Sequence, residues 1–370
     1  MKRIFALSLA LCMLLCACAG SGNQPTEPTQ ESTAETTEAT TAPTTVPTEP
    51  PTEPPTEPPV LYRHPLTGEP LSTLWTGRAT AVAVNNIKAC LPQHGIGDAD
   101  MLYEVETEGG ITRCLAVFSD FSEVGKLGPI RSTRTYFNNL ALAYDAPLIH
   151  CGGSARALNA WFDDSGSTIK NWNHINQQNN GSYFYRDQER RKANYAYEHT
   201  LFTTGENMLL ALEKKKYNTT NEAGTDYGLT FADAPEFAGE TANSIVVKFR
   251  GSKTTTFTYL PDSGVYEAAE YGKPWVDANT DVTLAFRNVL VLYTKQWFIS
   301  DGTYNRSYYD LVGSGKGVFA CDGKLVPIKW SRADLRSPFV YTLEDGTPLT
   351  LGVGTSYIGV VSNNRTVEYQ

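Results

Sequence analysis

The sequence has 370 residues, of which 41% are hydrophobic and 19% charged, and its net charge is −9. Much of the negative charge lies near the N-terminus, where residues 19–60 hold seven glutamates and no basic residue, after Lys2 and Arg3 in the first residues. Residues 61–370 therefore keep a net charge of −4. This near balance excludes general attraction to nucleic acid or to anionic surfaces, so any anion site must be local.

A lipoprotein leader is predicted over residues 1–17. The apolar run from Ile4 to Leu15 is too short for a comfortable membrane span and is typical of a secretory signal. Leu15-Cys16-Ala17-Cys18 then resembles the lipobox of bacterial lipoproteins, in which the leader is cut before a cysteine that becomes lipidated. We expect Cys18 to be a palmitate-type anchor on the extracytoplasmic face of the cell membrane. The alternative is an ordinary signal peptide rich in cysteine.

The segment 18–60 is predicted to be a disordered tether. It consists almost entirely of Pro, Thr, Glu and Ser, and the motif PTEP recurs in it. Such a composition has too little apolar surface to offset the entropy of ordering, and its prolines favour extended backbone. The tether would hold the folded part away from the membrane.

An α+β fold is predicted after the tether, with a mixed α/β domain over residues 61–217. Strands are expected at 79–84 and 111–118, and Glu108-Gly109-Gly110 can turn residues 103–107 back onto the second of them as a hairpin. Helical spacing follows at 136–144, then a strand at 147–151. Further helices are expected at 154–162 and 208–216.

A linker is predicted over residues 218–240, followed by a mostly β domain over 241–370. Strand patterns separated by Gly- and Asp-rich turns dominate this part, which indicates a sandwich or a barrel. The expected strands are 245–249, 255–259, 282–286, 289–294, 318–321 and 357–361.

Alternating carboxylates are the first candidate for chemistry. Glu104, Glu106 and Glu108 would share one face of a regular strand. Their repulsion requires compensation by nearby arginines, with Arg113 the nearest, or by a divalent metal. The alternative is a solvated edge strand.

Arginines at a predicted helix start are the second candidate. In Gly128-Pro129-Ile130-Arg131-Ser132-Thr133-Arg134, Ser132 or Thr133 can cap the helix beside two guanidinium groups. Helix N-termini and arginines both bind phosphate or carboxylate oxygens. The anion would be either a ligand or the glutamates themselves.

Other polar residues extend this candidate ligand site. His150 and Ser154 flank a strand-to-helix turn, and Arg186 and Arg190 lie in a charged cluster. Cys151 follows His150, but adjacent strand residues point to opposite faces, so a buried or disulfide-bonded cysteine is favoured over a nucleophile. Together with Cys90, Cys114 and Cys321 it shows no zinc-type spacing, so no metal site is predicted, and no motif identifies a cofactor.

Several motifs resemble those of the YerB-like lipoproteins, a domain-of-unknown-function family. The most specific are Glu-Gly-Gly-x-Thr-Arg at 108–113 and Gly-Pro-x-Arg-Ser-x-Arg at 128–134. His150-x-Gly-Gly-Ser154 and the Gly313-x-Gly315-x-Gly317 stretch extend the resemblance over nearly all of residues 61–370. The resemblance implies a surface lipoprotein with two matched domains.

Three functions fit these features. The first is a binding protein for an anionic cell-envelope ligand (a cell-wall glycan, a phosphate or a lipid-linked precursor), with aromatic residues such as Trp275 available for sugars. The second is a phosphoryl- or glycan-transfer enzyme, in which arginines stabilise developing charge and a glutamate acts as base. The third is an interaction scaffold in which the charged cluster only stabilises the fold.

Overall fold

The computed structural model describes residues 62–163, 165–169, 172–221 and 225–370. The leader, Cys18 and the tether lie outside the described residues. Within the described part, no helix combines the length and the apolar character needed to cross a membrane.

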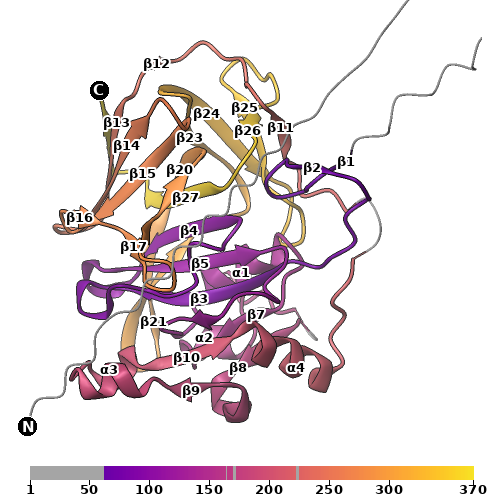
Figure 1. Cartoon of the computed structure of the whole chain (residues 1–370), viewed down its shortest axis with the longest axis vertical. Coiled ribbons are helices and arrows are strands. Elements are labelled where there is room, and N and C mark those ends of the chain that lie inside the picture. The colour runs from indigo at the N-terminus through magenta and orange to yellow at the C-terminus, as the bar shows by residue number, and fades with distance from the viewer. Residues whose placement is uncertain (1–61, 164, 170–171, 222–224) are drawn as a thin grey trace, which may run out of the picture. The chain divides into compact units, whose positions relative to one another are not determined.

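One large mixed sheet of eleven strands runs through the folded part (Figure 1). Its order is β12-β24-β23-β20-β27-β4-β5-β3-β7-β8, with β25 also paired to β24. The strands from the first half of the chain are β3 (Thr80–Asn86), β4 (Met101–Glu106), β5 (Thr112–Phe118), β7 (Leu148–His150) and β8 (His174–Asn176). Those from the second half are β12 (Glu240–Thr241), β20 (Asn288–Thr294), β23 (Gly313–Cys321), β24 (Lys324–Arg332), β25 (Val340–Leu343) and β27 (Ser356–Ser362).

The two halves meet where β27 pairs in parallel with β4, from Ser356 beside Met101 to Val360 beside Val105. Both strands are completely buried, as expected for parallel strands covered on both faces. One compact unit accordingly extends over Pro59–Gln370. The predicted linker at residues 218–240, which would separate two domains, stays a prediction.

A second sheet covers one face of the large one. It has the order β16-β15-β14-β13-β28, with β19 paired to β15. A continuous apolar core joins the two sheets and includes Val84, Leu102, Phe257 and Tyr357. The strands are β13 (Ser244–Lys248), β14 (Thr254–Leu260), β15 (Val265–Glu270), β16 (Lys273–Pro274), β19 (Ala285–Phe286) and β28 (Val367–Tyr369).

The opposite face of the large sheet packs against helix α1 and against loops of the second half. Tyr103 and Val105 of β4 contribute to this second core together with Tyr136 and Phe137 of α1. The α-helices are α1 (Thr135–Leu142), α2 (Ala155–Leu158), α3 (Gln188–Lys192) and α4 (Gly205–Lys215).

Short sheets complete the fold. They are β1 (Tyr62–Arg63) with β2 (Pro70–Leu71); β6 (Lys126–Leu127), β10 (Leu201–Thr204) and β9 (Tyr185–Arg186); β11 (Thr230–Ala232) with β26 (Thr350–Gly352); β17 (Val276–Asp277) with β18 (Val282–Thr283); and β21 (Gln296–Asp301) with β22 (Tyr304–Tyr309). Because β11 pairs with β26, part of the predicted linker is tied to the second half.

The predicted fold class, mixed α/β followed by mostly β, is confirmed. The predicted hairpin is also confirmed as β4 and β5, which pair in antiparallel fashion around Gly109 and Gly110. Both glycines have positive φ, which the turn requires. The predicted helix 154–162 is wrong in length, because α2 ends at Leu158 and Ala160 takes a left-handed conformation.

Candidate functional site

The segment that leads into α1 is fixed by backbone hydrogen bonds on both sides. The N–H group of Arg131 donates to Ala83 O of β3 (2.8 Å), and that of Cys151 donates to Arg131 O (3.0 Å). The prediction that Ser132 or Thr133 caps α1 is wrong: Arg134 occupies the cap position, without a side-chain cap bond. The Thr133 hydroxyl donates instead to Asn138 Oδ1.

The three glutamates of the hairpin do not form one cluster. Glu104 and Glu106 lie on β4, but Glu108 belongs to the turn that follows, so the prediction of a shared face is wrong for Glu108. Each carboxylate has its own cation: Lys253 at 2.8 Å from Glu104, Arg365 at 3.3 Å from Glu106, and Arg134 at 2.8 Å from Glu108. No described group of three or more His, Cys, Asp or Glu residues could hold a metal ion.

Arg134 and Glu108 form a partly buried, bidentate ion pair. Arg134 Nε donates to Glu108 Oε1 (3.0 Å), and its Nη2 donates to Oε2 (2.8 Å). Arg306 of β22 lies 3.3 Å from the same carboxylate. Burial alone would raise the pKa of Glu108, but the hydrogen bonds and charge of Arg134 and the charge of Arg306 lower it to about 2. Arg134 is thus neutralised inside the protein.

Arg113 has no such partner. It stands opposite Val105 in the hairpin and therefore on the α1 side of the sheet, away from Glu104. The prediction that Arg113 compensates the β4 carboxylates is wrong for that reason. Its side chain donates to Ser132 O (2.7 Å), and its Nε has no partner among the described residues. Burial, with the positive charges of Arg134 and Arg131, lowers the pKa of Arg113 to about 9.

Ser132, whose carbonyl group Arg113 contacts, lines a small pocket with a volume of about 120 Å³. We call it the arginine pocket; its lining is Ile130, Arg131, Ser132, Cys151, Arg186, Tyr197, Glu198 and Leu201. The guanidinium of Arg131 is 3.7 Å from the half-exposed carboxylate of Glu198, and its Nε has no partner in the described chain. Arg186 lies 3.8 Å from the centre of the Tyr197 ring and donates to Tyr197 O (2.7 Å).

The pocket therefore combines two guanidinium groups with a single carboxylate. Arginine forks suit planar or tetrahedral oxyanions such as carboxylate and phosphate. Burial raises the pKa of the Cys151 thiol, which donates to Gln177 Oε1 (3.3 Å) and stays protonated near neutral pH. The four described cysteines, Cys90, Cys114, Cys151 and Cys321, are free.

Three other candidate residues have internal partners instead. His150 is fully buried, shares hydrogen bonds with Gly152 O and His174, and is neutral because burial lowers its pKa to about 3. Ser154 caps α2. Arg190 donates to Cys90 O (2.7 Å) and packs over Phe202. The structure thus brings Arg131, Ser132 and Arg186 together, with Arg113 behind them, and gives the remaining candidates structural contacts.

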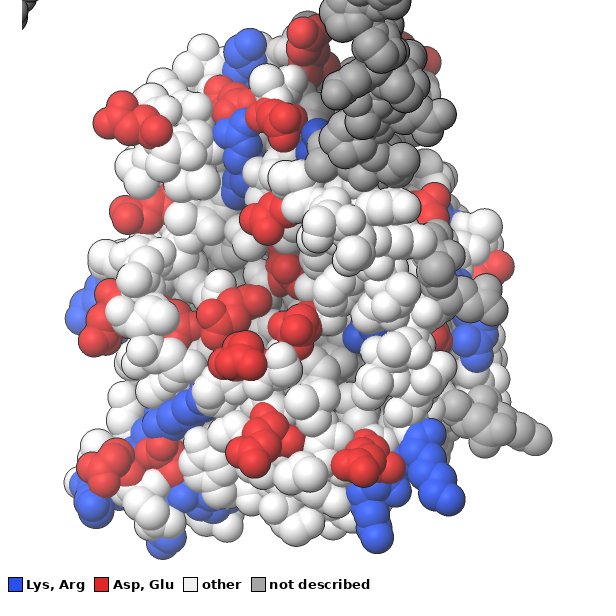
Figure 2. Space-filling view, turned by 45° about the vertical axis from the view of Figure 1, so that its right-hand side comes forward, with Lys and Arg blue, Asp and Glu red and all other residues white. Residues whose placement is uncertain are grey.

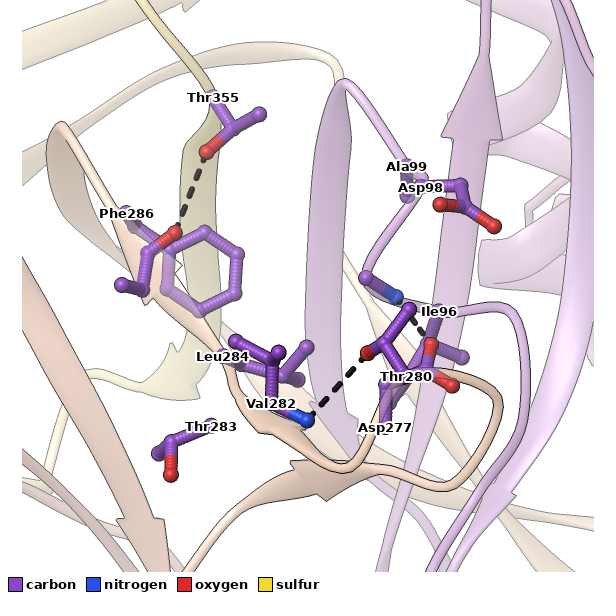
Figure 3. Close-up of a pocket in the computed structure, with 12 residues that line it drawn as sticks. Ile96, Asp98, Ala99, Asp277, Thr280, Val282, Thr283, Leu284, Phe286 and Thr355 are labelled. Carbon is purple, nitrogen blue, oxygen red and sulfur yellow. Dashed lines mark hydrogen bonds between the residues drawn. The ribbon is translucent and has the colours of Figure 1, made fainter. Parts of the chain in front are cut away.

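Figure 2 shows acidic and basic side chains interspersed over one face of the molecule, without a continuous patch of either sign. A larger cavity, of about 340 Å³, is lined by residues of the Asp98 loop and of the strands β17 to β19 (Figure 3). There Val282 N donates to Thr280 Oγ1, and no lysine or arginine belongs to the lining. This cavity does not suit an anion.

Lys253 and Glu270 are ionisable residues that the sequence did not reveal. Both are buried in strands or turns of the second half and meet Glu104 of the first half. Lys253 precedes a Thr-rich strand and has no local pattern that separates it from a surface lysine. Only the pairing of the two halves brings these residues together.

Comparison with known proteins identifies the family of this chain. Family models match residues 66–218, as the N-terminal domain of a protein of unknown function (DUF3048), and residues 245–358, as the C-terminal domain of the same family. The Bacillus subtilis (strain 168) protein named "Putative lipoprotein YerB" is 27% identical over 304 residues, which cover 80% of this chain and 85% of that protein. The crystal structure of YerB from Bacillus subtilis has a TM-score of 0.70 at 25% identity, covering 83% of this chain and 99% of that one. The chain belongs to the DUF3048 family, of which it has both the N-terminal and the C-terminal domain.

Proposed function

We propose that this protein is a lipoprotein, anchored through Cys18 to the extracytoplasmic face of the bacterial membrane, that binds an anionic cell-envelope ligand in the arginine pocket. The lipobox-like sequence before Cys18 and the name of the Bacillus subtilis relative support the anchoring. A glycan or lipid-linked precursor that carries phosphate or carboxylate supplies the anion.

The observation that carries the binding proposal is uncompensated positive charge. Arg131, Arg186 and the adjacent Arg113 have one carboxylate among them within ion-pair distance, and the side chain of that residue, Glu198, is 56% exposed. Arg113 is buried and Arg131 and Arg186 are partly buried, and cations in such positions are normally paired, so an oxyanion from outside would offset this charge. Its oxygens would accept hydrogen bonds from Arg131 and Arg186.

Isothermal titration calorimetry on the detergent-solubilised lipoprotein tests this proposal. The probes are inorganic pyrophosphate, a glycerol-phosphate teichoic-acid fragment and a muropeptide. Charge-assisted hydrogen bonds contribute about 1.5–3 kcal/mol, so we expect Arg131→Ala or Arg186→Ala to weaken binding of the best probe at least tenfold.

Arg191→Ala is the matched control, since Arg191 is an exposed arginine on the neighbouring helix α3. Its affinity should equal that of the wild type. If no probe binds, or if all three variants bind equally well, the proposal is wrong and the arginines serve the fold alone.

A further inference from the structure

The arginine pocket carries a carboxylate at its rim as well as guanidinium groups further in. The side chain of Glu198 is 56% exposed, whereas that of Arg131, 3.7 Å away, is 20% exposed. The two groups attract each other, but a distance of 3.7 Å is too long for a hydrogen bond. Neither side chain has a hydrogen bond to any other residue in the described part of the chain, so both keep their hydrogen-bonding capacity for a ligand.

Arg186 supplies the second guanidinium group of the pocket lining. Its Nη1 donates to Tyr197 O (2.7 Å), and its guanidinium carbon lies 3.8 Å from the centre of the exposed Tyr197 ring. Its Nε and Nη2 have no partner among the described residues. The contact with Tyr197 thus holds the arginine in place and leaves donors available, so that Arg186 can share one carboxylate with Arg131.

His199 leaves the negative charge of Glu198 in place. Its Nε2 lies 3.9 Å from the Glu198 carboxylate, and its Nδ1 accepts a hydrogen bond from Asn85 Nδ2 (2.9 Å). An imidazole nitrogen that accepts a hydrogen bond carries no proton, so this ring is neutral. Burial lowers the pKa of His199 despite the charge of Glu198, in agreement with a neutral ring. Glu198 is therefore an ionised acceptor at the rim of the pocket.

The size and the charges of the pocket restrict its ligand. Its volume of about 120 Å³ is below the range of about 300–1,000 Å³ for sites that enclose drug-sized ligands, so one small group enters and a whole sugar ring does not. A carboxylate brings one negative charge and two coplanar oxygens, which suit a guanidinium. The second charge of a phosphate monoester would be repelled by Glu198, whereas an ammonium group beside the carboxylate would donate to it.

Given the proposed function of anion binding, on which this step rests, we propose that the arginine pocket binds an α-amino carboxylate. The carboxylate accepts hydrogen bonds from Arg131 and Arg186, and the ammonium group donates to Glu198. Because Glu198 is the more exposed side chain, the ammonium group lies at the mouth of the pocket. A free amino acid has this pattern of charge, and so has an amino-acid unit of an envelope glycopeptide in which both groups are free.

Calorimetric titration of the detergent-solubilised lipoprotein with small probes of similar size tests the proposal. Alanine, in its D- and L-forms, carries both charges. Lactate has a hydroxyl group in place of the ammonium group, and alaninamide lacks the carboxylate, while inorganic phosphate tests a plain oxyanion. We expect one enantiomer of alanine to bind at least tenfold more tightly than the other three compounds, because alanine alone meets both the arginines and Glu198.

Glu198→Gln separates the contributions of the two charges. The amide keeps the shape of the side chain and loses the charge that attracts ammonium, so alanine should bind at least tenfold more weakly and lactate equally well or more tightly. Arg131→Ala removes a partner of the carboxylate and should weaken alanine and lactate alike. Glu189→Gln is the matched control, since Glu189 lies on helix α3 with its side chain 80% exposed, and it should leave every affinity as in the wild type.

The outcomes distinguish this proposal from anion binding in general. Absence of binding by both enantiomers of alanine at millimolar concentration overturns it, and so does a preference for alanine over lactate that Glu198→Gln leaves unchanged. If phosphate or lactate binds more tightly than alanine and loses affinity in Arg131→Ala, anion binding in the arginine pocket stands and the α-amino carboxylate is the wrong ligand. If Arg131→Ala changes no affinity, both proposals are wrong.

Discussion

Arg131 and Arg134 lie three residues apart but have different surroundings. The side chain of Arg134 is 5% exposed and forms a bidentate pair with Glu108, whereas that of Arg131 is 20% exposed and has a distant, half-exposed partner. The same residue type therefore has two different environments in one motif. Arg134 is neutralised internally by Glu108, whereas Arg131 is the arginine to which our proposal assigns the ligand.

Replacement of the two arginines should separate these roles. Arg134→Ala leaves the Glu108 carboxylate with Arg306 as its one ion-pair partner among the described residues and with the N–H group of Ser307, so we expect the free energy of unfolding to fall by about 2–3 kcal/mol. Arg131→Ala removes only a partly exposed ion pair at 3.7 Å, so it should change the free energy of unfolding by less than about 0.5 kcal/mol. Urea unfolding at pH 7 measures both values. Equal destabilisation by the two variants would contradict this division of roles.

The pH dependence of the free energy of unfolding is a second test of the Arg134–Glu108 pair. The pKa of Glu108 is about 2 in the folded protein and about 4.3 in an unfolded chain, so the folded state binds this proton more weakly. The stabilisation is therefore present above about pH 5 and is lost as the pH falls toward 2. The stability difference between wild type and Arg134→Ala should shrink over that window.

At the scale of elements, the sequence predicts strands well and their partners poorly. The hairpin of β4 and β5 follows from alternation around Gly109 and Gly110, since both strands and their turn are neighbours in the chain. By contrast, the predicted strand 282–286 is two short strands, because β18 pairs with β17 and β19 pairs with β15. No local pattern encodes those separate partners.

The candidate site shows the same limit. The Gly-Pro-x-Arg-Ser-x-Arg motif leads to Arg131 and Ser132, which do line the arginine pocket. Arg306, however, reaches Glu108 from the β21–β22 hairpin, and Ser307 N donates to the same carboxylate (3.2 Å). That hairpin lies almost 200 residues away in the chain, so its contact depends on tertiary folding alone. Arg306 is therefore a counter-ion of Glu108 that the sequence did not predict.

Gly128 positions the segment that carries Arg131. Its φ is +145°, and a Cβ atom there would lie 2.9 Å from Leu201 O and 3.0 Å from Ile130 N. We expect Gly128→Ala to lower the free energy of unfolding by about 1–3 kcal/mol and to weaken anion binding, because the backbone must shift. Gly125→Ala, three residues earlier, meets no atom within 4 Å and is the control. Thermal unfolding measures the stability of each variant, and calorimetry measures its affinity for the anion. Equal stability and equal affinity of the two variants would contradict this prediction.

At the scale of the whole molecule, Arg332 connects the two halves of the chain. It lies on β24 and is 1% exposed, and its guanidinium donates to Asn139 of helix α1 as well as to Leu335 O (2.6 Å) and Ser337 O (2.7 Å). Together with the pairing of β27 and β4, this contact makes the sheet and helix α1 depend on each other. The halves should consequently unfold together.

Arg332→Ala tests that coupling. The substitution leaves buried carbonyl groups and Asn139 without their donor, so we expect a loss of about 2–4 kcal/mol in the free energy of unfolding. Because the halves share one sheet, far-UV circular dichroism and tryptophan fluorescence should still report one coincident transition, shifted to lower denaturant. Lys329→Ala, an exposed change on the same strand, should leave that transition in place. Two separated transitions, of which Arg332→Ala moves only one, would instead mean that residues 61–217 and 241–370 unfold as independent domains despite their common sheet.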